Sequence, residues 1–200
     1  MPEKLAAGLY MYLYIGFPGK NTLAGRDHRL LLSGCALSLI CKACYMNTPE
    51  EKFLRNEMMP LLQTLTPVSE AKWGKMNAQQ MIEHLAAFFK VSTNRLKFPL
   101  ITPEEQLPAY KAFLLSNKQF RENTQAPLSV LPSEPLPLRH PGMEEAMAAL
   151  DHAATEFYQF FATDPSLQTT HPVFGPLNYH EWILLHYKHV SHHARQFSLM

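Results

Sequence analysis

Apolar residues recur every three or four positions in four segments between residue 48 and the end of the chain. This spacing places them on one face of an α-helix. We therefore predict helices over residues 49–65, 77–94, 143–163 and 178–198. A weaker repeat predicts a short additional helix near residues 109–117. No segment after residue 47 alternates convincingly between apolar and polar positions, so the pattern predicts an all-α protein without a sheet.

The starts of three predicted helices rest on capping boxes. In a capping box, two side chains three residues apart each satisfy one backbone N–H group at the start of a helix. Three such pairs are present: Thr48 with Glu51, Asn77 with Gln80, and Asn178 with Glu181. Pro60 lies inside the first helix and should kink or divide it, because proline has no backbone donor and clashes with the preceding turn.

Proline is concentrated before the third main helix. Five prolines lie between residues 126 and 142: Pro127, Pro132, Pro135, Pro137 and Pro141. Such a segment cannot continue a helix, so we predict an extended crossover around the outside of the helices. The pattern as a whole predicts a four-helix bundle with a long proline-rich crossover before the third helix. A chain of 200 residues, 46% of them hydrophobic, suits one such domain with an extension.

Residues 1–47 do not share the helical pattern. Two apolar runs, Leu5–Phe17 and Leu30–Cys41, are too short to cross a bilayer. The second run follows a basic flank and resembles a signal peptide, which would imply export. The interpretation we favour is that translation begins at Met46 and that the protein is cytoplasmic. We therefore predict an N-terminal extension over residues 1–47 and the bundle over residues 48–200.

Charge and cysteine content argue against several functions. The formal net charge is +1, and Lys and Arg do not gather on one helix face, as they would in a nucleic-acid-binding protein. The three cysteines, Cys35, Cys41 and Cys44, lie near the N-terminus, so no disulfide framework spans the body of the fold. Cys41 and Cys44 form a CxxC motif, a weak indication of redox chemistry or zinc. We expect neither a nucleic-acid partner nor a membrane partner.

Histidines gather in the last predicted helix, which holds five of the ten: His180, His186, His189, His192 and His193. His189 and His193 are four residues apart, so their rings lie on one face about one turn apart. Two imidazoles at this spacing can bind one metal ion. His84 lies in the apolar stripe of the second helix, where a single histidine is usually a hydrogen-bonded core residue. Together with the other pair, it becomes a candidate third ligand.

Three segments carry a resemblance to a known family: MNAQQMIEHL at residues 76–85, FGPLNYHEW at 174–182 and HVSHHARQ at 189–196. Together they resemble the DinB/YfiT-like superfamily of four-helix metalloenzymes, in particular a small bacterial branch with a WGKMN-type entry to the second helix. The resemblance covers residues 48–197. It implies that His84, His189 and His193 bind a divalent metal ion.

The predicted site has a defined geometry and chemistry. Three neutral imidazoles with an open fourth position are typical of a catalytic metal site, and this donor set favours zinc or nickel. Helices that face each other lie ~8–10 Å apart, and metal–nitrogen bonds are about 2 Å long. The three ring nitrogens should therefore converge within ~3–4 Å, and separations well beyond ~6 Å would reject the site.

Two functions remain open. The first is a metal-dependent thiol S-transferase or hydrolase, in which the site activates water or a low-molecular-weight thiol for transfer to a small electrophile. The resemblance implies this thiol chemistry and a small-molecule substrate. The alternative is a non-enzymatic stress-related bundle, a homodimer in this interpretation, with a structural or vestigial metal site. A role on DNA is disfavoured by the near-neutral charge.

Several further residues have predicted places. Gln196 and His192 are expected beside the metal ligands, where such groups orient a ligand by hydrogen bonding. His186, three residues before His189, is an alternative ligand. Trp73 and Trp182 are predicted core anchors. The remaining histidines are predicted on the surface or in loops: His28, His140, His152 and His171.

Overall fold

The computed structural model describes residues 48–164 and 166–200, and the extension predicted over residues 1–47, with its CxxC motif, lies outside them. The elements follow in this order: α2 (Pro49–Lys52), the π-helical segment η1 (Phe53–Glu57), α3 (Met58–Leu62), α4 (Ala78–Ser92), the 3-10 helix η2 (Glu104–Gln106), α5 (Leu107–Leu114), α6 (Met143–Ala162), β1 (Thr169–His171), β2 (Gly175–Leu177) and α7 (Tyr179–Gln196). The described residues are mostly helical, which confirms the predicted all-α class. None of their helices is long and apolar enough to cross a membrane.

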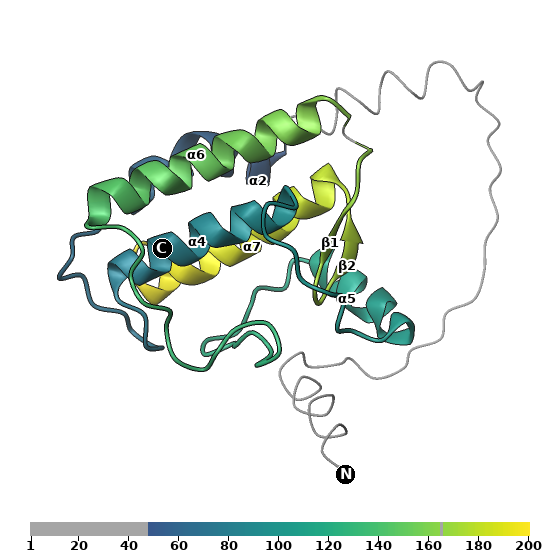
Figure 1. The fold of residues 1–200 in the computed structure, drawn as a ribbon, viewed down its shortest axis with the longest axis horizontal. Coiled ribbons are helices and arrows are strands. Elements are labelled where there is room, and N and C mark those ends of the chain that lie inside the picture. Colours follow the sequence, from purple (N-terminus) through teal and green to yellow (C-terminus); the bar gives the residue numbers. More distant parts are fainter. Residues whose placement is uncertain (1–47, 165) are drawn as a thin grey trace, which may run out of the picture. The chain divides into compact units, whose positions relative to one another are not determined.

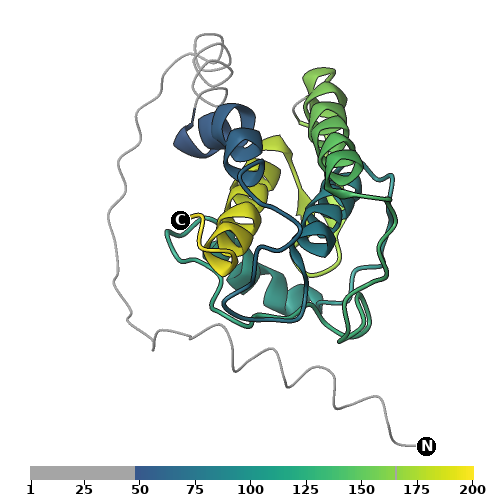
Figure 2. The same ribbon diagram turned by 90° about the vertical axis from the view of Figure 1, so that its left-hand side faces the viewer.

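The long helices α4, α6 and α7 form the body of residues 49–200 (Figure 1). α4 packs along α6 and also contacts α7, which in turn packs against α2 and η1. Figure 2 shows the same order from one end of the helices. Large apolar side chains fill the space between them, and Phe89, Phe157 and Trp182 are completely buried. The core therefore lies between the helices that also carry the candidate ligands.

The capping boxes predicted for α4 and α7 are both present. Asn77 Oδ1 accepts a hydrogen bond from the Gln80 backbone at 2.8 Å, and Gln80 Oε1 accepts one from the Asn77 backbone at 3.0 Å. Asn178 and Glu181 exchange the corresponding bonds at 3.0 Å each. These bonds satisfy backbone donors that would otherwise have no partner at a helix start. They explain why both helices begin where the sequence predicts.

The first predicted helix is divided into three pieces. The N–H group of Met58 donates to the carbonyl of Phe53, five residues earlier, so the helix is locally of the π type. Pro60 follows directly and offers no N–H group to the carbonyl four residues before it. The irregularity expected at this proline therefore takes the form of a π-helical segment in front of it. The last piece, α3, ends at Leu62, before the predicted position 65.

Glu51 takes part in a buried network that the sequence did not reveal. Its side chain is 2% exposed, and its Oε1 atom accepts hydrogen bonds from the Tyr179 hydroxyl at 2.5 Å and from Arg55 Nε at 2.8 Å. Arg55 also donates to the Tyr179 hydroxyl at 3.0 Å and lies over the ring of Tyr158, 3.7 Å from its centre. This network connects the first helical segment to α6 and α7.

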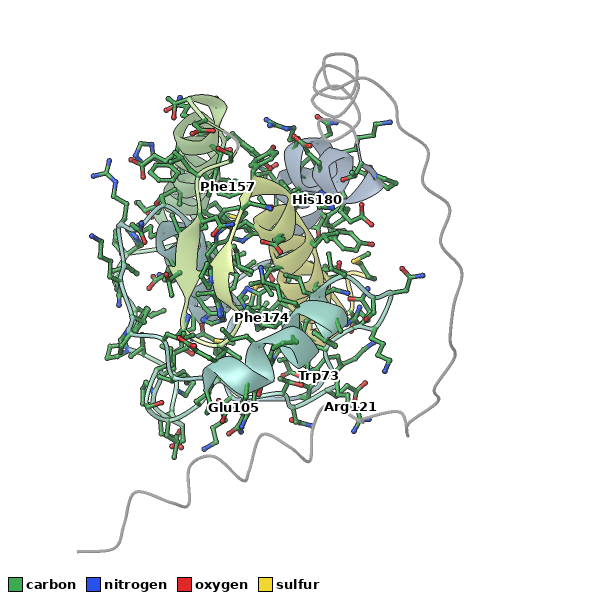
Figure 3. All side chains as sticks on the ribbon, turned by 90° about the vertical axis from the view of Figure 1, so that its right-hand side faces the viewer. Trp73, Glu105, Arg121, Phe157, Phe174 and His180 are labelled. Carbon is green, nitrogen blue, oxygen red and sulfur yellow. The ribbon has the colours of Figure 1, made fainter. Side chains whose placement is uncertain are left out.

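A short β-hairpin precedes α7, so the expectation of no β-structure is wrong for residues 169–177. β1 pairs with β2 in antiparallel fashion, with Thr169 opposite Leu177. Each strand has only three residues, and so short a strand leaves no recognisable alternation in the sequence. Phe174 lies at the turn of the hairpin, on the side of α5 (Figure 3). Its ring centre is 6.3 Å from that of Phe113 on α5.

The proline-rich crossover is attached to the first turns of α4. Between α5 and α6, residues 115–142 form no helix or strand, which agrees with the crossover predicted over residues 126–142, and the short helix predicted near residues 109–117 is α5, which ends earlier, at Leu114. Gln80 Nε2 donates to the carbonyl of Leu136 at 3.1 Å. The two carboxylate oxygens of Glu83 accept hydrogen bonds from the backbone N–H groups of Arg139 and His140, at 2.8 and 3.1 Å. These bonds satisfy polar backbone groups that prolines leave without helical partners.

Candidate metal centre

The side chains of His84, His189 and His193 meet between α4 and α7, and we call them the three-histidine cluster. The Nε2 atoms of His84 and His189 are 2.9 Å apart, and those of His189 and His193 are 3.1 Å apart. One nitrogen from each ring lies within 4.8 Å of the other two, in a group that could hold a metal ion. The separations fall inside the ~6 Å limit beyond which bond lengths of about 2 Å exclude a shared ion.

Local helix geometry explains how the rings meet. His189 and His193 are one turn apart on α7, and their ring centres are 4.7 Å apart. The ring of His84, on α4, lies edge-to-face with both, at 4.8 and 5.0 Å. The two capping boxes fix where α4 and α7 begin, and the packing of α4 against α7 then brings the ring of His84 to the other two.

All three rings of the cluster are neutral at neutral pH. Burial, and after it the nearby ring of His192, lowers the pKa of His84 to about 4. Burial lowers the pKa of His189 and of His193 well below the ordinary histidine value, and the neighbouring rings of the cluster act in the same direction. Neutral imidazole is the form that binds a metal ion, so the environment keeps the cluster ready as a ligand set.

Gln196 determines which nitrogen of His193 carries the proton. Its Nε2 atom donates to the backbone carbonyl of Trp73 at 2.6 Å, and its Oε1 atom lies 2.7 Å from Nδ1 of His193. A carbonyl only accepts hydrogen bonds, so the amide nitrogen must face Trp73 and the amide oxygen must face His193. That oxygen also only accepts, so the proton of His193 lies on Nδ1. We call this chain of two hydrogen bonds the Gln196 relay.

The number of hydrogens at the cluster favours a cation. Because Nδ1 of His193 carries the proton, its Nε2 atom presents a lone pair to His189. A proton on Nε2 of His189 could be directed well at only one of its two neighbours, since the nitrogen has a single N–H group. A divalent cation would accept a lone pair from each of the three Nε2 atoms, so the residues present fit such an ion.

His192 lies beside the cluster, with its ring centre 5.1 Å from that of His193. Its ring bonds to the backbone of Phe120 and contacts the rings of Phe120 and Trp73 edge-on. Phe88 also packs on the cluster, with its ring centre 4.2 Å from that of His189. These aromatic contacts lower the local dielectric, which strengthens electrostatic interactions at the cluster.

Two other histidines lie in the core. His186 stacks on Phe89 at 3.8 Å, and its Nε2 atom lies 3.1 Å from the hydroxyl oxygen of Ser92. It is therefore directed away from the cluster, against its interpretation as an alternative ligand. His171 was predicted on the surface or in a loop, and this prediction is wrong, because His171 is the last residue of β1 and is buried. It is 7% exposed, and its Nδ1 atom accepts hydrogen bonds from the backbone of Val173 at 3.0 Å and of Phe174 at 3.2 Å.

The two tryptophans differ. Trp182 is completely buried, which confirms it as a core anchor. Trp73 is partly buried, and its backbone carbonyl joins the Gln196 relay, a role that the sequence reading missed. The signal available was the glycine that follows it, Gly74, which allows the chain to pass close to α7.

The fold and the cluster define a helical bundle with a three-histidine group between two of its helices. The sequence-family model of the DinB superfamily matches residues 52–197 of the chain. The chain therefore belongs to the DinB superfamily, as the sequence motifs indicated. Comparison with curated proteins and with solved structures found no match.

Proposed function

We propose that this protein is a divalent-metal-dependent enzyme and that His84, His189 and His193 hold the metal ion. The observation that carries the proposal is the convergence of one ring nitrogen from each histidine, all within 4.8 Å of one another, in rings that are neutral at neutral pH. Membership in the DinB superfamily, which includes metal-dependent members, supports it. Zinc and nickel suit a set of three imidazoles better than magnesium or calcium, which prefer oxygen ligands.

Each residue has a defined part in this proposal. His84 supplies a ligand from α4, and His189 and His193 supply two from α7. Gln196 accepts a hydrogen bond from Nδ1 of His193, so the lone pair on Nε2 of His193 is directed at the cluster. Phe88 packs on His189 and excludes water from that side. A divalent ion held there would supply Lewis-acid chemistry, which brings the pKa of water or a thiol toward neutrality.

The reaction we propose is the transfer of a low-molecular-weight thiol, or of water, to a small electrophile. Three protein ligands leave a tetrahedral ion one position short, which is the ligand count of catalytic rather than structural zinc sites. Neutral rings suit this role because none of them must lose a proton before a ligand bond forms. The alternative, a bundle with a structural metal, predicts that the fold itself depends on the ion.

The experiment compares wild type with His193→Ala, purified without a histidine tag. His193→Ala should lose most of the bound zinc or nickel, measured by elemental analysis, while its helical circular dichroism persists. His152→Ala is the matched control, because the His152 side chain is 72% exposed on α6, outside the cluster. Equal metal content in wild type and His193→Ala would overturn the proposed site.

Activity requires a separate assay. Metal-loaded wild type should conjugate a small thiol to a chromogenic electrophile faster than metal-stripped wild type or His193→Ala. Loss of helical structure on metal removal would favour the structural alternative, because a catalytic ion is not needed for the fold. Metal binding without any thiol-dependent or hydrolytic turnover would contradict the proposed reaction.

A further inference from the structure

We infer that Gly74 is a positioning residue. Because Gly74 has no side chain, the Gln196 amide can keep the orientation that forms the Gln196 relay, and this orientation places the proton of His193 on Nδ1. Its importance for a metal ion rests on the proposed function, but the proton position belongs to the metal-free protein. Gly74 lies in the loop between α3 and α4, next to Trp73, whose carbonyl begins the relay.

The loop passes very close to the end of α7. The backbone N–H group of Lys72 donates to the main-chain carbonyl of Gln196 at 2.8 Å, and the carbonyl of Trp73 accepts from the side chain of the same residue at 2.6 Å. Gln196 is 3% exposed, so these bonds are shielded from water. The loop therefore forms hydrogen bonds with both the backbone and the side chain of Gln196.

A glycine is required at position 74 for these hydrogen bonds, for two independent reasons. Its φ is +82°, a conformation that residues with a side chain rarely adopt. A Cβ atom at this position would lie 2.5 Å from Nε2 of Gln196, well inside van der Waals contact. Any larger residue must therefore displace the Gln196 amide, the loop, or both.

The orientation of the Gln196 amide determines the tautomer of His193. With its nitrogen on Trp73, the amide presents oxygen to His193, and the ring proton lies on Nδ1. If the amide turned over or moved away, the proton could shift to Nε2, the nitrogen that faces His189. That proton would occupy the centre of the cluster, where a metal ion needs a lone pair.

The hydrogen bond from Gln196 to His193 matters because His189, another candidate ligand, has no corresponding hydrogen bond at its Nδ1 atom. Nδ1 of His189 is buried and has no hydrogen-bond partner among the residues that the structure describes. Of the two candidate ligands on α7, His193 is therefore the one whose tautomer is determined by a hydrogen bond from Nδ1 to a neighbouring side chain. Partners of this kind typically change metal affinity 10- to 100-fold, on the order of what we expect for Gly74→Ala.

The test is nitrogen-15 NMR of the imidazole of His193 in metal-free protein, with the signals assigned by comparison with His193→Ala. Wild type should show a single tautomer with the proton on Nδ1. Gly74→Ala should show a mixture or the Nε2–H tautomer. Gly74→Asn should behave in the same way, because asparagine tolerates positive φ yet still carries a Cβ atom. This second variant separates the contact with Gln196 from backbone strain.

Gly142→Ala is the control. Gly142 has an extended φ of −161°, and a Cβ atom there would lie 3.1 Å from the flexible carboxylate of Glu145 on α6. The nitrogen-15 spectrum of His193 in Gly142→Ala should match that in wild type. An Nε2–H tautomer in wild type, or an unchanged Nδ1–H tautomer in both Gly74 variants, would overturn the inference. A shifted tautomer in a protein that binds no zinc or nickel would uphold it and reject the proposed function.

Discussion

The hydroxyl group of Tyr179 offers a sharp test of the buried network at the first helix. It donates to Glu51 Oε1 at 2.5 Å and accepts from Arg55 Nη2 at 3.0 Å. Tyr179→Phe removes both bonds and keeps the ring, which stacks on Phe157 with centres 5.6 Å apart. The substitution therefore isolates the hydrogen bonds from the packing.

The expected cost follows from the charges involved. A hydrogen bond to a charged group contributes roughly 1.5–3 kcal/mol to stability. Tyr179 makes two such bonds, but Arg55 Nε remains paired with Glu51 at 2.8 Å after the change. Glu51 thus keeps a partner, and we expect a loss of about 2 kcal/mol in the free energy of unfolding. For a domain of about 150 residues this corresponds to a fall in Tm of roughly 4–8 °C.

Urea unfolding followed by circular dichroism measures this loss, provided that the slope with denaturant stays constant. Tyr158→Phe is the matched control. Arg55 lies over its ring, but its buried hydroxyl has no hydrogen-bond partner among the described residues. Removing it should not lower the free energy of unfolding, because a buried hydroxyl without a hydrogen-bond partner contributes no bond that could be lost. Equal effects of the two substitutions, or a loss below about 0.5 kcal/mol for Tyr179→Phe, would refute the reasoning.

Two further predictions concern His171 and Lys188. Burial lowers the pKa of His171 to about 3, whereas the pKa of histidine in the unfolded chain is about 6.5. Between pH 6.5 and pH 3 the unfolded state therefore binds more protons than the folded state, so lowering the pH destabilises the fold. This one ring should lower the free energy of unfolding of metal-free protein by about 2 kcal/mol between pH 7 and pH 5, in addition to the contributions of the buried rings of His84, His189 and His193, and equal values by urea unfolding at the two pH values would contradict this. Lys188 Nζ donates to the carbonyls of Ser116 and Lys118 at 2.6 Å each, so Lys188→Met should cost about 1–3 kcal/mol. Lys118→Met, at an exposed side chain, should change stability little by the same measurement.

The sequence by itself determined the parts of the site that depend on neighbours a few residues apart. The capping boxes at Asn77 and Asn178 predicted the starts of α4 and α7, because the bonds involved join residues three positions apart. The spacing of His189 and His193 placed both rings on one face for the same local reason. His84 joined them through the family motif, and the structure brings all three together.

Tertiary structure alone decided the contacts between segments that are distant in the sequence. The sequence predicts Glu51 as a capping residue, whereas in the structure its carboxylate accepts a hydrogen bond from Tyr179, 128 positions away. His171 reads as a loop residue, and only the packing of the hairpin buries it. Gln196 meets the carbonyl of Trp73 across 123 positions. Periodicity and capping describe interactions within one turn of helix, whereas these bonds depend on how whole helices and loops pack.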